Sequence, residues 1–98
     1  MAPEEAVFGK LRVVPVSSDE VPSFDDDVCV GIYGFRTRQL FNSEKRKVDV
    51  YFNAVEGCCL SAMQGRETVL YCDGEMVDAV VSRIKDLQRF GRSPEVIL

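Results

Sequence analysis

The hydrophobic period of the chain changes once, near residue 73, and this change is the strongest constraint on its fold. Upstream, apolar residues alternate with polar ones, which is typical of strands with one buried face. Downstream, apolar residues recur at spacings of three, one, three and three, which places them on one stripe of an amphipathic helix. The stripe consists of Val77, Val80, Val81, Ile84 and Leu87. The pattern therefore predicts a run of strands followed by one helix.

The helix is predicted over residues 74–90. Asp73 is a suitable N-cap, and Gly91 fits the left-handed position that follows many helices. Two acidic residues, Glu75 and Asp78, lie near the predicted start, where the helix dipole favours negative charge. The sequence therefore indicates both ends of this helix, in addition to its buried face.

The alternating part of the chain predicts five strands, separated by short glycine-containing or polar connections. Parallel strands need a crossover of a dozen or more residues, so the short connections favour an antiparallel meander. An acidic connection without hydrophobic period follows the first strand, at residues 17–27. The predicted strands are residues 7–16, 28–41, 48–55, 58–63 and 67–72. A single domain is expected over 7–91, with a short acidic tail at 1–6 and a C-terminal tail at 92–98.

The order of elements resembles the pleckstrin-homology superfold, which includes phosphotyrosine-binding domains and the third lobe of FERM domains. Gly9-Lys10-Leu11 is similar to the glycine-x-leucine of its first strand. Arg36-Thr37-Arg38 is similar to the basic pattern of its phosphoinositide-binding members, and residues 68–72 are similar to its last strand. The resemblance implies an α+β fold. In it, an antiparallel bent sheet or partly open barrel of five to seven strands is capped by one C-terminal helix.

The residue types present argue against an enzyme. The chain has no histidine, which excludes Ser-His-Asp and Cys-His catalysis and His-ligated metal sites. Cys29 and Arg36 are separated by six residues, as are Cys59 and Arg66, whereas a phosphatase loop has five between its cysteine and its arginine. No glycine-rich phosphate loop precedes the helix. We therefore predict no catalytic residue, no metal and no cofactor.

The four cysteines and the N-terminus favour a cytoplasmic location. The first residues lack the basic and apolar regions of a signal peptide, and no apolar run approaches the roughly 18 residues of a membrane span. In a reducing compartment cysteines behave as small hydrophobic residues. We expect Cys29, Cys58, Cys59 and Cys72 to be buried thiols.

The charge distribution suggests an anion-binding surface. The net charge of −4 argues against nucleic acid as a partner, yet residues 31–53 are net positive. This basic cluster could bind an acidic peptide or an anionic lipid, and a phosphoinositide-binding membrane adaptor is the alternative function. A solvated hairpin, or pairing with the acidic residues 17–27, would explain the same charges. The cluster, with one upstream lysine, comprises Lys10, Arg36, Arg38, Lys45, Arg46 and Lys47.

The leading prediction is a non-enzymatic protein–protein interaction module, and we expect it to be part of a scaffold or cytoskeletal protein. The resemblance implies that a partner peptide, or a second copy of the chain, adds as a strand beside the last helix. A homo-oligomer is thus one expected outcome. The predicted peptide groove comprises Val69, Tyr71, Met76, Ala79 and Arg83.

Two serines are candidate phosphorylation sites. Ser17 and Ser23 each have an acidic residue three positions on, at Glu20 and Asp26, a spacing that acid-directed kinases favour. A phosphate at either serine would make the acidic connection more negative.

Overall fold

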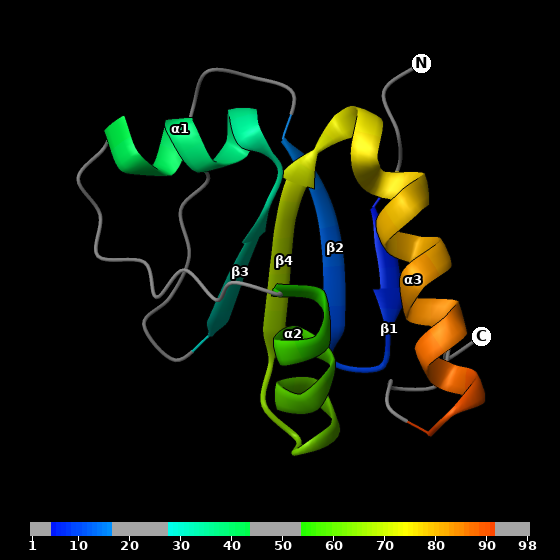
Figure 1. Ribbon diagram of the computed structural model, residues 1–98. Helices are drawn as coiled ribbons and strands as arrows, with labels where there is room; N and C mark the ends of the chain where they lie inside the picture. The colour runs from blue at the N-terminus through cyan, green and yellow to red at the C-terminus, as the bar shows by residue number, and fades with distance from the viewer. Residues whose placement is uncertain (1–4, 17–27, 44–53, 92–98) are drawn as a thin grey trace.

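A computed structural model describes residues 5–16, 28–43 and 54–91, with backbone alone at 41–43 and 54. Within these ranges, four strands form one mixed sheet in the order β1-β2-β4-β3. The first pair, β1 and β2, is antiparallel, whereas β4 is parallel to both of its neighbours, β2 and β3. Two helices, α2 and α3, pack against one face of the sheet, and α1 lies across the end where β3 and β4 finish (Figure 1).

The first predicted strand is a hairpin in the structure. β1 (Ala6–Phe8) and β2 (Leu11–Val16) are joined by a two-residue turn at Gly9 and Lys10. Gly9 has a φ of 59°, a left-handed conformation that glycine adopts without steric cost. The alternation of the sequence continues through the turn, which is why residues 7–16 look like one strand.

The second predicted strand ends early and becomes a helix. β3 (Cys29–Tyr33) stops at Gly34, whose φ is 105°, and α1 (Phe35–Ser43) follows directly. Residues 35–41 are therefore helical, and the prediction of a strand over 28–41 is wrong in its second half. Of the predicted strand at 48–55, only residues 54 and 55 are described, and they begin α2.

The predicted strand at 58–63 is also helical. It forms most of α2 (Ala54–Met63), whose buried residues are Val55, Cys58, Cys59 and Ala62. Spacings of three, one and three put these residues on one face of a helix. A helix here supplies part of the crossover that parallel strands require.

The C-terminal part of the prediction is confirmed. β4 (Thr68–Asp73) matches the fifth predicted strand, and it leads into a 3-10 turn, η1 (Gly74–Met76), and then α3 (Val77–Arg89). Gly91 follows α3 with a φ of 66°, as the sequence indicates. The α3 stripe buries Val77, Val80, Ile84 and Leu87.

The core lies between the sheet and the two helices α2 and α3. Leu11, Val13, Leu70 and Cys72 supply the sheet side, and the buried stripes of α2 and α3 supply the other. The opposite face of the sheet is also apolar, with a buried cluster of Val30, Ile32, Val69 and Tyr71. Every residue of β4 is buried, so residues 69–72 form a continuous apolar run instead of alternating, with the polar Thr68 and Asp73 at the two ends.

The predicted fold class is wrong in its architecture. The structure is α+β, but the described residues form a four-stranded mixed sheet with helices α1, α2 and α3, not a five-to-seven-stranded antiparallel barrel with one helix. The error arises because residues of α1 and α2 were predicted as strands. The remaining connections were then too short to join parallel strands, so an antiparallel sheet was predicted. Among the described helices, none is long and apolar enough to cross a bilayer.

Candidate binding groove between two helices

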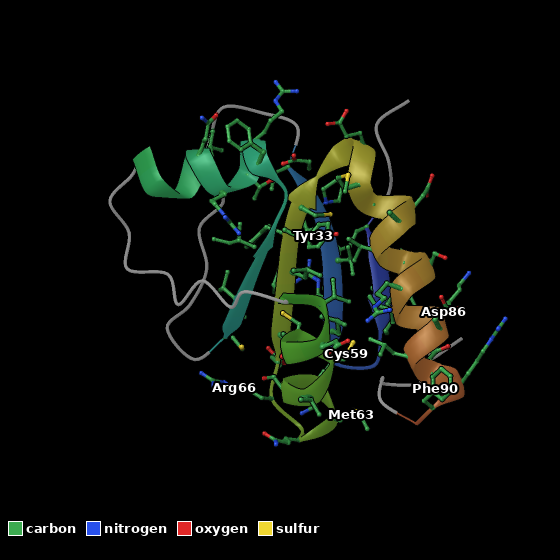
Figure 2. All side chains as sticks on the ribbon, in the orientation of Figure 1. Tyr33, Cys59, Met63, Arg66, Asp86 and Phe90 are labelled. Atoms are coloured by element: carbon green, nitrogen blue, oxygen red, sulfur yellow. The ribbon has the colours of Figure 1, made fainter. Side chains whose placement is uncertain are left out.

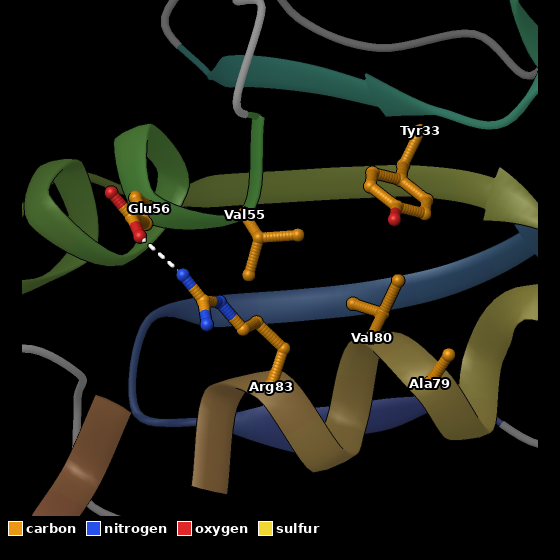
Figure 3. Close-up of a pocket in the computed structure, with 6 residues that line it drawn as sticks. All are labelled: Tyr33, Val55, Glu56, Ala79, Val80 and Arg83. Atoms are coloured by element: carbon orange, nitrogen blue, oxygen red, sulfur yellow. Dashed lines mark hydrogen bonds and ion pairs between the residues drawn. The ribbon is translucent and has the colours of Figure 1, made fainter. Parts of the chain in front are cut away.

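A cavity of about 350 Å³ opens between α2 and α3, next to Tyr33 at the end of β3. Its apolar lining comes from Val55 at the start of α2, and from Ala79 and Val80 on α3. Tyr33, the last residue of β3, contributes its ring and hydroxyl. Figure 3 shows these side chains pointing toward a common space. The volume is at the lower end of the range for ligand cavities.

An ion pair crosses the rim of this cavity. Arg83 Nη2 on α3 donates a hydrogen bond to Glu56 Oε1 on α2 at 2.7 Å (Figure 3). The two side chains are 58 % and 48 % exposed, and an ion pair this exposed contributes only about 0.2–1 kcal/mol. Either group can therefore change partner at little cost.

The ion pair also links α2 to α3. Both helices run opposite to β4, so α2 and α3 run in the same direction (Figure 1). Seven residues beyond Glu56 is Met63, and seven beyond Arg83 is Phe90. Seven residues are about two helical turns, or roughly 10 Å of rise, so both return to the same side of their helices. Figure 2 places Met63 and Phe90 at the same ends of α2 and α3.

Met63 and Phe90 are both strongly exposed, at 47 % and 76 %. The ion-paired Glu56 and Arg83 belong to the lining of the cavity, whereas Met63 and Phe90 do not.

The predicted peptide groove is not assembled as one surface. Val69 and Tyr71 are buried on the sheet face that α2 and α3 do not cover, whereas Met76, Ala79 and Arg83 belong to η1 and α3 on the other side. Moreover, β4 pairs with β2 on one side and β3 on the other, so a peptide cannot add to it as a strand. Ala79 and Arg83 do meet, in the cavity between the helices.

The predicted basic cluster is split. Lys10 lies where β2 and β4 begin, and its Nζ donates to the Gly65 carbonyl at 2.9 Å. Arg36 and Arg38 lie in α1, beyond the opposite ends of the strands. Lys10 therefore does not share a site with these two arginines. The remaining members, Lys45, Arg46 and Lys47, and the two candidate phosphorylation sites, Ser17 and Ser23, lie outside the described residues.

A second cavity, of about 280 Å³, opens beside Lys10 at the N-terminal ends of the strands. Val7, Val28 and Val69 line it together with the stems of Lys10 and Arg12. Lys10 already holds the Gly65 carbonyl, and Arg12 forms an ion pair with Glu5. The hydrogen bond from Arg12 holds the pKa of Glu5 below its usual value. Glu5 is therefore ionised at neutral pH and remains paired with Arg12.

The cysteines are buried, as the sequence predicts. No disulfide links them. Burial raises the pKa of the Cys58 thiol to about 12 and that of Cys72 to about 11. At neutral pH these two groups are therefore neutral thiols, poor nucleophiles and poor metal ligands. No cluster of three or more potential metal ligands occurs within the ranges that the structure describes.

Tyr33, Val55, Glu56 and Val80 line the cavity but were not predicted as site residues. In the predicted meander, Tyr33 and Val55 belong to adjacent antiparallel strands. That arrangement did not predict that either residue lies next to Val80 of the last helix. The helical spacing of the α2 residues was the available signal. Comparison with protein-family models, with curated proteins and with solved structures found no match for this chain.

Proposed function

We propose that the protein is a non-enzymatic interaction module that holds an apolar side chain of a partner polypeptide in the cavity between α2 and α3. The observation that carries the proposal is the cavity itself. It has an apolar lining from Val55, Ala79 and Val80, and a rim made by Glu56 and Arg83. Small cavities with apolar walls and a few polar groups are the usual anchor sites of interaction surfaces.

The chemistry around the cavity supports binding more than catalysis. The charged pair at the rim is exposed and salt-bridged, so neither member has the buried position that is typical of a general acid or base. The thiols of Cys58 and Cys72, whose pKa values are raised, are held in the protonated form by burial. We place this function in the cytoplasm, because buried unbridged thiols suit a reducing compartment.

The test is to fill the cavity from its solvent side. Ala79 is exposed and lines the cavity, so Ala79→Phe occupies the space without disturbing the buried stripe of α3. Ser82→Phe is the matched control, since Ser82 is exposed on the same helix but does not line the cavity. The probe is a displayed library of random 16-residue peptides, selected against the wild-type protein.

For the enriched peptides, we expect Ala79→Phe to weaken binding at least tenfold and Ser82→Phe to change it less than twofold. Fluorescence anisotropy gives both affinities, and thermal melting checks that the variants fold. A library that yields no peptide sensitive to Ala79→Phe would refute the proposed function.

A further inference from the structure

We infer that the partner side chain held in the cavity between α2 and α3 is a tyrosine, whose hydroxyl pairs with the hydroxyl of Tyr33. The inference rests on the proposed function, and deepens it by naming the chemistry of the side chain that is bound. Three features of the cavity support it. They are the Tyr33 hydroxyl at one end, the Arg83 guanidinium at the other, and the apolar walls between them (Figure 3).

The Tyr33 hydroxyl has no hydrogen-bond partner among the residues that the structure describes. Figure 3 shows it pointing into the cavity, toward the side chains of Val55 and Val80. Since no buried side-chain oxygen or nitrogen of the described residues lacks a partner, this hydroxyl is open to solvent through the cavity. A ligand that displaces water from it has to supply a hydrogen bond, because a buried and unpaired hydroxyl is destabilising. The bound side chain therefore carries a hydrogen-bonding group at its tip.

The walls of the cavity require that the rest of the bound side chain is apolar. Val55 and Val80 are buried, and Ala79 adds a methyl group on the solvent side. None of these three side chains can donate or accept a hydrogen bond, so a charged or amide group lying against them would lose its water without compensation. A purely aliphatic anchor would instead leave the Tyr33 hydroxyl unpaired. The side chain that meets both requirements has an apolar body and a polar tip.

Tyrosine fits these requirements better than other side chains. Its hydroxyl lies at the far end of the ring, in line with the β-carbon, and both donates and accepts, so it can pair with the Tyr33 hydroxyl in either sense. The N–H of a tryptophan lies at the side of its double ring and only donates. Serine and threonine carry their hydroxyl on the β-carbon, beside the partner's backbone, and have no apolar body to fill the space between the walls.

Arg83 favours an aromatic ring over an aliphatic chain, and does so without giving up its ion pair. Its hydrogen bond to Glu56 is made through Nη2, close to the plane of the guanidinium, so this bond does not cover the flat faces of the group. A guanidinium stacks on the face of a tyrosine ring. Because the Arg83 side chain is 58 % exposed, a ring that enters past the rim can contact it. A tyrosine is thus bound by Arg83 at its ring and by Tyr33 at its tip.

The test uses the tightest selected peptide that is sensitive to Ala79→Phe. We expect it to contain a tyrosine whose replacement by phenylalanine weakens binding at least fivefold. Tyr33→Phe in the protein should cause a similar loss, because both changes break the same hydrogen bond. The two changes together should then cost no more than either alone, within twofold. Tyr71→Phe is the matched control, because Tyr71 lies on the sheet face that α2 and α3 do not cover, and it should change the affinity less than twofold.

A second pair of variants tests the contact with the ring. Arg83→Gln removes the guanidinium and should weaken binding of the same peptide about threefold. Arg89→Gln is its control, because Arg89 is exposed on the same helix but does not line the cavity. Thermal melting checks that all the variants fold. Equal affinities of the two variants would contradict the contact between Arg83 and the ring.

The possible outcomes separate the two proposals. If binding depends on Ala79 but the selected peptides share no tyrosine, or if the losses from Tyr33→Phe and from the peptide change add, the cavity is a binding site and the tyrosine inference is wrong. If sedimentation shows that the protein self-associates and Ala79→Phe abolishes this, the occupant is a second copy and the inference of a partner tyrosine is also overturned. If no selected peptide responds to Ala79→Phe, the proposed function itself fails.

Discussion

The carboxylate of Asp73, at the end of β4, caps the start of α1 through Thr37. Its Oδ1 accepts a hydrogen bond from the Thr37 backbone N–H at 2.7 Å and another from the Thr37 hydroxyl at 2.8 Å. The Arg36 N–H adds a third, to Oδ2 at 3.2 Å. Asp73 and Thr37 are both buried, so these bonds fix the N-terminus of α1 to the end of the central strand.

The Thr37 hydroxyl should contribute measurably to stability. Thr37→Val removes one hydrogen bond to a buried carboxylate, and such bonds to charged groups contribute about 1.5–3 kcal/mol. We expect a loss of that size in the free energy of unfolding, measured with urea. Thr37→Ser keeps the hydroxyl and should lose less than half as much. Equal losses in the two variants would mean that the hydroxyl bond is not the cause.

The same site predicts a pH dependence. Burial alone raises the pKa of Asp73, but the hydrogen bonds from Thr37 and Arg36 outweigh it, so the pKa lies below its usual value of 3.8. A lowered pKa contributes stability above the unfolded value, and this is lost as pH falls through the folded value. The stability difference between wild type and Asp73→Asn should be constant above about pH 5 and shrink below pH 4. A difference that stays constant down to pH 2 would contradict this.

Gly34 should tolerate no side chain. A Cβ there would lie 2.5 Å from Asp73 Cγ, and the φ of +105° is unfavourable for other residues. Gly65 is the control, because it has a φ of +88° but nothing within 4 Å of an added Cβ. We expect Gly65→Ala to cost about 1–2 kcal/mol of unfolding free energy. Gly34→Ala should cost about 1–3 kcal/mol more, because of the clash. Similar losses in both would show that Asp73 moves away freely.

Cys58 should be nearly inert toward alkylation in the folded protein. Its pKa is raised from 9.0 to about 12, which lowers the thiolate fraction at pH 8 about 1000-fold. Iodoacetamide labelling followed by mass spectrometry should therefore be slow in buffer and fast in urea. Labelling of Cys58 at the same rate in both conditions would indicate that α2 opens readily.

The last strand and the last helix, β4 and α3, were predictable because their signals are local. The stripe of α3 and the glycine that ends it are contained in the sequence of that segment, and they gave the correct helix. Cysteine burial was predicted from a different argument, the expectation of a reducing compartment, and the four cysteines are buried. For α2 the local signal was present in the spacing of Val55, Cys58, Cys59 and Ala62 but was divided between two predicted strands.

The start of α1 depends on a residue that is distant in the sequence. Among its described side chains, at residues 35–40, Thr37 is the one buried residue, so this part of the helix shows no apolar stripe. The carboxylate that caps it comes from Asp73, 36 residues later, which was predicted to cap the last helix instead. In the structure, Asp73 makes no side-chain cap at η1. Without α1 and α2, the sequence could not predict a parallel sheet or the cavity.

The most direct test of the cavity between α2 and α3 is a nuclear Overhauser experiment on the complex with the tightest peptide selected from the displayed library, using methyl-labelled protein. Val55 and Val80 line the proposed cavity, whereas Val7, Val28 and Val69 line the second cavity beside Lys10. Contacts between the peptide's apolar anchor and the methyl groups of Val55 and Val80 are the predicted result. Contacts with Val7, Val28 or Val69 alone would place the partner elsewhere and contradict the binding site proposed for this protein.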